Sequence, residues 1–193
     1  MTARTIDVEG LPREPRKGRG VRVSDDTLLS YDLLVLADDV ESVIGAAGGW
    51  LCDRVRAGWR VTVLAPTELD PRPLTILGLG TAAADTLIAL PPGRRPTALA
   101  VDARLASRHE ATRDMVLRAV DDTRTEVTMW GESSLFAADR RFRRVHHRLS
   151  AAARAFKGSA LRSCGVPVAD LTVEAFHSAA LWYPPDGTDL ALG

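Results

Sequence analysis

The sequence predicts an α/β protein, a single doubly wound, Rossmann-like domain. We expect a mostly parallel sheet of about five strands, with helices on both faces. Three observations support this fold class. Residues 32–66 read as strand, helix, strand, and apolar segments of strand and helix length alternate along most of the chain. No internal repeat or linker divides the 193 residues, of which 46% are hydrophobic, enough for one sizeable core.

The segment of residues 32–66 is the clearest unit. Residues 33–36 are apolar and of strand length, and Asp38 and Asp39 follow as candidate helix caps. Gly58 stands where a left-handed residue would end the helix, and residues 60–64 form a second strand. The apolar stripe of the helix consists of Val40, Val43, Ile44, Ala47, Leu51 and Val55. These features predict a βαβ unit with two parallel strands and a right-handed crossover.

The middle of the chain predicts two more strands. Residues 74–77 form an apolar run that ends in Gly-Leu-Gly, and residues 81–90 can hold a short helix. Residues 97–101 are the next strand, closed by Asp102. Ser107 and Glu110 have the spacing of a capping box, which predicts that a helix begins between them.

The C-terminal part predicts a strand over residues 126–130, a long helix over residues 139–157 and a last helix over residues 172–181. For the domain limits, we expect a flexible arm over residues 1–20, the α/β domain over residues 21–185 and a tail over residues 186–193.

Composition narrows the possible functions. The formal net charge is zero, so no global field favours nucleic acid or a membrane surface. Two cysteines, far apart in sequence, have no metal-site spacing. The N-terminus lacks an apolar signal region, and no apolar run reaches transmembrane length. We therefore expect a cytoplasmic protein that does not enter a membrane.

Candidate ligand-binding residues follow from the fold, because open parallel sheets bind ligands beyond the carboxyl ends of their strands. The residues at these ends are Asp38, Asp39, Gly78, Gly80, Asp102, Trp130 and Glu132. Converging carboxylates are typical of a Mg²⁺ site, whereas the simpler interpretation is that each aspartate caps its own helix. Three glycines early in the first helix match no phosphate-loop motif, which favours close packing instead: Gly45, Gly48 and Gly49.

The residues from 33 to 63 also support a family resemblance. A strand, acidic residues, Gly-x-x-Gly-Gly and Gly-x-x-Val-Thr-Val resemble the opening of the zinc-dependent LmbE/PIG-L deacetylases. In that family the motif is His-Pro-Asp-Asp-Glu. Asp39 matches its general-base position and Glu41 also matches, but the metal-binding His and Asp are replaced by Ala37 and Val40. The later His-x-x-His is also missing, so the resemblance does not imply zinc or deacetylation here.

The predicted long helix carries the strongest local charge. Residues 139–162 hold eight basic side chains and one acidic side chain. Candidate partner-binding residues are Arg140, Arg141, Arg144 and Arg148. A basic face of this kind can bind an acidic protein, bind the phosphate backbone of a nucleic acid, or remain solvated.

No nucleophile–base pair, metal-ligand set or phosphate loop stands out, and no cofactor is indicated. The sequence therefore favours a non-catalytic cytoplasmic regulatory or protein-interaction protein on a Rossmann-like scaffold. Two alternatives stay open. One is a Mg²⁺-dependent hydrolase or phosphotransferase that uses the acidic crevice, and the other is a nucleotide-binding module.

Overall fold

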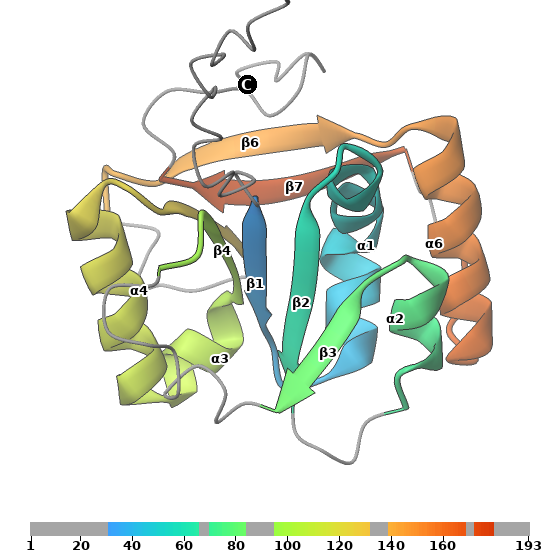
Figure 1. Cartoon of the computed structure of the whole chain (residues 1–193), viewed down its shortest axis with the longest axis horizontal. Coiled ribbons are helices and arrows are strands. Elements are labelled where there is room, and N and C mark those ends of the chain that lie inside the picture. Colours follow the sequence, from blue (N-terminus) through green and yellow to red (C-terminus); the bar gives the residue numbers. More distant parts are fainter. Residues whose placement is uncertain (1–30, 66–69, 84–94, 132–138, 169–171, 180–193) are drawn as a thin grey trace, which may run out of the picture.

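The computed structural model describes residues 31–65, 70–83, 95–131, 139–168 and 172–179. In these residues, strands and helices alternate along the chain (Figure 1). The elements are β1 (Asp32–Leu36), α1 (Val40–Arg56), β2 (Arg60–Ala65), α2 (Arg72–Ile76), β3 (Gly80–Ala83), β4 (Ala98–Asp102), α3 (Ala103–Arg108), α4 (Glu110–Asp122), β5 (Glu126–Trp130), β6 (Arg143–Arg148), α6 (Ala151–Ser163) and β7 (Val173–Ser178).

The described residues form a sheet of seven strands in the order β3-β2-β1-β4-β5-β7-β6. The first five in this order are parallel, and β7 pairs antiparallel with both β5 and β6. The parallel pairing of β1 with β2 confirms the predicted βαβ unit. The predicted α/β class with a mostly parallel sheet is also confirmed, although the sheet has two strands more than expected.

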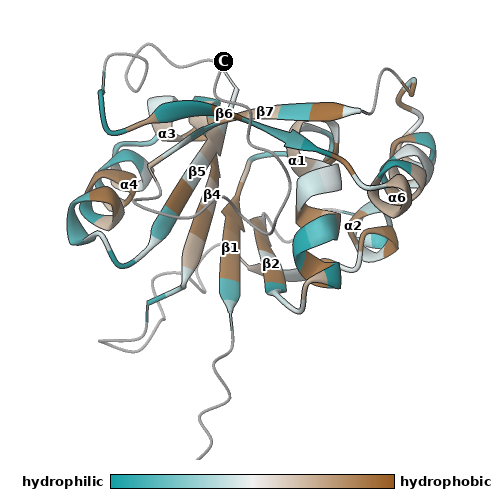
Figure 2. Cartoon of the chain, turned by 90° about the horizontal axis from the view of Figure 1, so that it is seen from above, coloured by the Kyte–Doolittle hydropathy of each residue, from teal (hydrophilic) through white to brown (hydrophobic). Residues whose placement is uncertain are grey.

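Two hydrophobic cores lie on opposite faces of the sheet. One joins β1 and β2 to α1, α2 and α6, and the other joins β4 and β5 to α3 and α4. Figure 2, coloured by hydropathy, shows these two groups of helices on either side of the strands. Alternate residues of β1 serve the two cores, since Leu33 and Val35 face α1 whereas Leu36 belongs to the second core. Helices on both faces keep the parallel strands out of water.

Helix α1 begins and ends as its sequence predicts. Asp39 is the N-cap, and its side chain accepts a hydrogen bond from the backbone N–H of Ser42 at 2.5 Å. Gly58 follows the helix with φ +91°, a conformation that favours glycine.

A Cβ at Gly49 would lie 2.0 Å from Leu149 Cδ2, so this position requires glycine for close packing. At Gly45, by contrast, a Cβ would meet no atom within 4 Å.

The predicted strand over residues 74–77 is wrong, because these residues lie in and just after α2. Pro71 and Pro73 suit the first turn of a helix, and Leu74 packs into the first core. Gly78 ends the turn after α2 with φ +78°, and Gly80 begins β3. Thr81 is therefore in a strand, and residues 84–90 of the predicted short helix lie outside the described residues.

The predicted long helix over residues 139–157 is also wrong. Residues 143–148 form β6, and α6 begins only after Ser150, whose hydroxyl accepts a hydrogen bond from the backbone N–H of Ala153. Residues 173–178 likewise form β7 rather than part of a helix. In β7, exposed and buried side chains alternate from residue 173 to residue 176, whereas β6 shows no such alternation. The pairing of β6 with β7 therefore overrides the helical spacing of the apolar residues.

The predicted capping box of Ser107 and Glu110 does not form. Ser107 lies in the last turn of α3, where its hydroxyl donates to the carbonyl of Ala103 at 2.8 Å. His109 is the N-cap of α4 and makes no side-chain capping bond.

Within the described ranges, no helix combines the length and the apolarity needed to cross a bilayer. The two cysteines, Cys52 and Cys164, are both free.

Candidate active site

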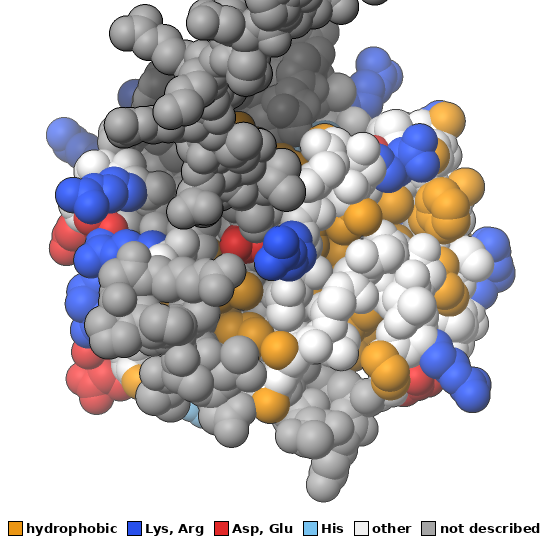
Figure 3. Space-filling model, in the orientation of Figure 1, with side chains coloured by type: hydrophobic (Ala, Val, Ile, Leu, Met, Phe, Trp, Pro, Cys, Tyr) orange, Lys and Arg blue, Asp and Glu red, His pale blue; other side chains and the backbone are white. Residues whose placement is uncertain are grey.

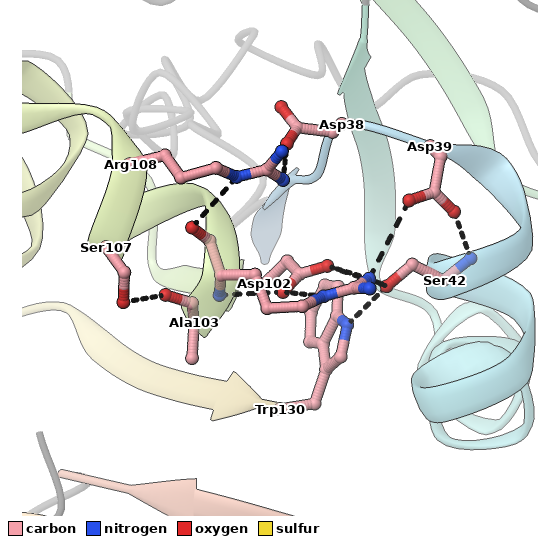
Figure 4. A network of polar contacts seen from close by, with 9 residues as sticks. Asp38, Asp39, Ser42, Asp102, Ala103, Ser107, Arg108 and Trp130 are labelled. Atoms are coloured by element: carbon pink, nitrogen blue, oxygen red, sulfur yellow. Dashed lines mark hydrogen bonds and ion pairs between the residues drawn. The ribbon is translucent and has the colours of Figure 1, made fainter. Parts of the chain in front are cut away.

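Three of the predicted carboxylates lie together at the carboxyl edge of the sheet (Figure 4). Asp38 and Asp39 follow β1, and Asp102 is the last residue of the neighbouring strand β4. Trp130, at the end of β5, is paired with Asp102 in the β4–β5 register. The parallel strands thus place residues from distant parts of the sequence at one edge, as the fold class predicts.

Asp102 is the centre of this cluster. Its side chain is only 1% exposed, and its Oδ2 accepts hydrogen bonds from the Ser42 hydroxyl and from Arg104 Nη2, each at 2.7 Å. Its Oδ1 accepts from the backbone N–H of Arg104 at 2.9 Å, which caps α3, and from Arg104 Nε at 3.2 Å. Burial acts to raise the pKa of Asp102, but the hydrogen bonds from Arg104 and Ser42 outweigh it and hold the pKa below its ordinary value.

Ser42 is held by three partners. Its hydroxyl donates to Asp102 and accepts from Arg104 Nη2 at 2.7 Å and from the indole Nε1 of Trp130 at 3.2 Å. Both acceptor positions of the oxygen are therefore occupied. Ser42 and the buried Trp130 position the charged groups, and neither is arranged as a nucleophile.

Asp39 and Arg104 form the part of the cluster that faces solvent. Their side chains are 48% and 54% exposed, and Asp39 Oδ2 lies 3.7 Å from Arg104 Nη2. The other oxygen of Asp39 accepts from the backbone N–H of Ser42. A carboxylate and a guanidinium thus lie side by side, each with access to a bound molecule. Asp38 lies beside them and makes an ion pair with Arg108.

A metal ion does not fit this cluster. Ala37 and Val40, which stand at the metal-binding positions of the LmbE/PIG-L motif, are buried apolar side chains and offer no ligand atom. The guanidinium of Arg104 supplies the positive charge between Asp39 and Asp102. In the part of the chain that the structure describes, no group of three or more His, Cys, Asp or Glu side chains could hold a metal ion.

The other predicted ligand-binding residues are not part of the cluster. Gly80 begins β3 and Gly78 precedes it, so both lie toward the opposite end of the sheet from the carboxyl edge. Their assignment to a strand end is wrong because residues 74–77 are helical. Glu132 lies outside the described residues.

Sequence reasoning missed three residues of the cluster: Ser42, Arg104 and Arg108. Two of them had a local signal, since Ser42 is three residues after the capping Asp39 and Arg104 is two residues after the capping Asp102. Arg108 pairs with Asp38 across 70 positions of sequence, and such a contact has no local signal.

The predicted basic face also differs in the structure. Arg140 and Arg141 lie in the turn before β6, and Arg144 and Arg148 lie on β6. Arg141 makes ion pairs with Asp139 and Asp121, which hold its pKa above the ordinary value. On the face shown in Figure 3, the blue basic side chains lie in several separate places, most of them near the outline and one near the centre. The predicted basic helix is wrong because Arg144 and Arg148 lie on a strand.

Comparisons with known proteins extend this description. No family model matches the chain, and no curated protein matches it in sequence. Among solved structures, the chain resembles a deacetylase of teicoplanin biosynthesis in complex with teicoplanin, with a TM-score of 0.53 and 14% sequence identity over 76% of this chain and 97% of that chain. A triple mutant of a deacetylase from the teicoplanin pathway gives a TM-score of 0.48, with 16% identity over 68% of this chain and 80% of that chain. At such identities the likeness shows the fold alone.

The likeness to the deacetylase in complex with teicoplanin contradicts the leading prediction from the sequence. That solved structure, which shares the fold with a TM-score above 0.5, is a deacetylase and not a regulatory or protein-interaction protein. The prediction of a non-catalytic regulatory scaffold is therefore wrong. The prediction depended on the lack of a recognisable motif, and residues that come together from separate strand ends, as around Asp102, leave no short motif in the sequence.

Proposed function

We propose that this chain is a hydrolase that cleaves an ester or amide bond without a metal ion. The observation that carries the proposal is the pairing of the half-exposed Asp39 and Arg104 at the carboxyl edge of the sheet. Asp39 also matches the general-base position of the LmbE/PIG-L motif. The fold shared with a teicoplanin-pathway deacetylase supports the hydrolytic class.

In the proposed reaction, Asp39 accepts a proton from a water molecule as the water oxygen attacks the carbonyl carbon. The carbonyl π electrons move to oxygen, and the guanidinium of Arg104 stabilises the resulting oxyanion. The proton held by Asp39 then passes to the leaving alcohol or amine as the bond to it breaks. The buried carboxylate of Asp102 keeps Arg104 in place through two side-chain hydrogen bonds.

The proposal also includes a Rossmann-like fold for the chain and a location in the cytoplasm. Helices on both faces and the strand order 3-2-1-4-5 in the parallel part support a doubly wound, Rossmann-like single domain. We also retain the cytoplasmic location expected from the sequence as part of the proposal.

The test is hydrolysis of activated esters and of N-acylated compounds, teicoplanin among them, with a chelator present. Asn caps a helix as well as Asp does, so Asp39→Asn should keep the fold while it lowers turnover by about 10² to 10⁴, the usual contribution of a general base. Arg104→Gln should lower kcat, whereas Arg118→Gln, an exposed change on α4, is the matched control. Turnover that is equal in the Asp39→Asn variant, or that is lost with the chelator, would refute the proposal.

A further inference from the structure

The outer strand pair β6–β7 has two different faces. Its inner face packs on α1 and α6 through the buried side chains of His147, Glu174 and Phe176. The outer face carries side chains that are exposed or half-buried, which are Arg144, His146 and Arg148 on β6 and Val173, Ala175 and His177 on β7. The register places Arg144 opposite His177, His146 opposite Ala175 and Arg148 opposite Val173, so these side chains form one continuous surface. We call it the β6–β7 outer face.

This surface is basic. The one acidic residue of the two strands, Glu174, points inward, where it pairs with Lys157 Nζ at 2.6 Å. Arg144 and Arg148 make no ion pair with any described residue. Two exposed guanidinium groups four residues apart on the same face of β6 favour a partner with carboxylates at matching spacing.

The same strand offers backbone groups as well. β6 is the last strand in the sheet order, so on its outer side no described strand pairs with its N–H and C=O groups (Figure 1). It is hydrophilic along most of its length (Figure 2), and charged side chains on an edge strand discourage unselective pairing with apolar strands. An edge of this kind can accept one more strand, and its side chains then select the partner.

From these observations we propose that β6 binds an acidic, extended segment of a partner protein by strand addition, with carboxylates of that segment on the β6–β7 outer face. A second copy of this chain fits less well, because pairing β6 with β6 would bring arginines toward arginines. A nucleic acid fits less well too, since the aromatic residue of these two strands, Phe176, is buried and cannot stack on bases.

The test uses a fluorescent peptide of alternating Glu and Val and measures its anisotropy as the full chain is added. We expect saturable binding that weakens with salt, and a loss of about tenfold or more in affinity for Arg144→Glu combined with Arg148→Glu. The matched control is Arg154→Glu with Arg162→Glu, which makes the same change in net charge on the exposed side of α6. If the Glu variant does not fold by circular dichroism, Arg144→Gln with Arg148→Gln replaces it.

A second arm separates strand addition from simple charge attraction. The same peptide with N-methyl groups on alternate backbone nitrogens keeps its carboxylates but loses donors for a β ladder, so it should bind at least about tenfold more weakly. Equal binding of this peptide, an equal loss in the α6 control, or no saturable binding to the intact chain would overturn the proposal. Tighter binding of single-stranded DNA than of the peptide, or a stable dimer of the chain, would overturn it in favour of another partner.

Discussion

Replacing Gly49 by alanine should destabilise the protein, although alanine is the better helix former. Gly49 lies in α1 and packs against Leu149, in the segment between β6 and α6. An added Cβ would lie 2.0 Å from Leu149 Cδ2, 2.5 Å from Leu149 Cγ and 3.1 Å from Glu174 Oε1. Leu149 is buried in the first core and Glu174 Oε1 is bonded to the N–H of Gly49, so neither neighbour can move away freely.

The magnitude follows from two opposing effects. In a helix interior, glycine to alanine usually gains about 1 kcal/mol. Overpacking of a core usually costs about 1–3 kcal/mol, and displacing Leu149 from its buried site adds a further loss of about 1.5–3 kcal/mol if it becomes exposed. If Leu149 is displaced, we therefore expect Gly49→Ala to lower the free energy of unfolding by about 1.5–5 kcal/mol. Each kcal/mol corresponds to about 2–4 °C in Tm.

Gly45 provides the matched control in the same helix. A Cβ there would meet nothing within 4 Å, so Gly45→Ala should raise the free energy of unfolding by about 0.5–1 kcal/mol. Urea unfolding followed by circular dichroism and by tryptophan fluorescence measures both variants. Equal stability of the two alanine variants would refute the close packing of Gly49.

Three further predictions concern ionisable groups. Lys157→Met should cost about 3–5 kcal/mol because it leaves the buried carboxyl group of Glu174 without its cation. Lys157→Met combined with Glu174→Gln should cost less, and a double variant no more stable than the single variant would contradict this. The pKa of Asp102 is lower in the folded protein than in the unfolded chain, so the charged carboxylate stabilises the fold above about pH 4. This contribution is lost as the pH falls through the lowered pKa. The difference in unfolding free energy between wild type and Asp102→Asn should therefore shrink between pH 7 and pH 3. Burial raises the pKa of both thiols, and Cys164 lies nearer the surface than the buried Cys52. Native protein should therefore react with a thiol reagent at Cys164 first and at Cys52 only on unfolding. Mass analysis of peptides would show which cysteine has reacted.

The sequence by itself determined the βαβ unit and the parallel core. Asp39 caps α1 and Gly58 follows it because these are local effects of a side-chain oxygen and of a residue without Cβ. The apolar runs of β1, β2, β4 and β5 were recognisable because strands buried on both faces are continuously apolar. These strand ends also predicted that Asp38, Asp39 and Asp102 would meet at one edge.

Only the tertiary structure decided what surrounds those carboxylates and how the C-terminal third folds. Arg104 and Arg108 supply positive charge to the cluster, and they reach Ser42 and Asp38 across 62 and 70 positions of sequence. The local pairing of Arg104 with Asp102 could have been noticed in the sequence, but no local pattern indicates these two long-range contacts. Residues 143–148 and 173–178 carry charged and apolar side chains at spacings that fit either a helix or a strand. They became strands because each pairs with the other, and β7 also pairs with β5, which satisfies backbone groups that the local sequence cannot assign.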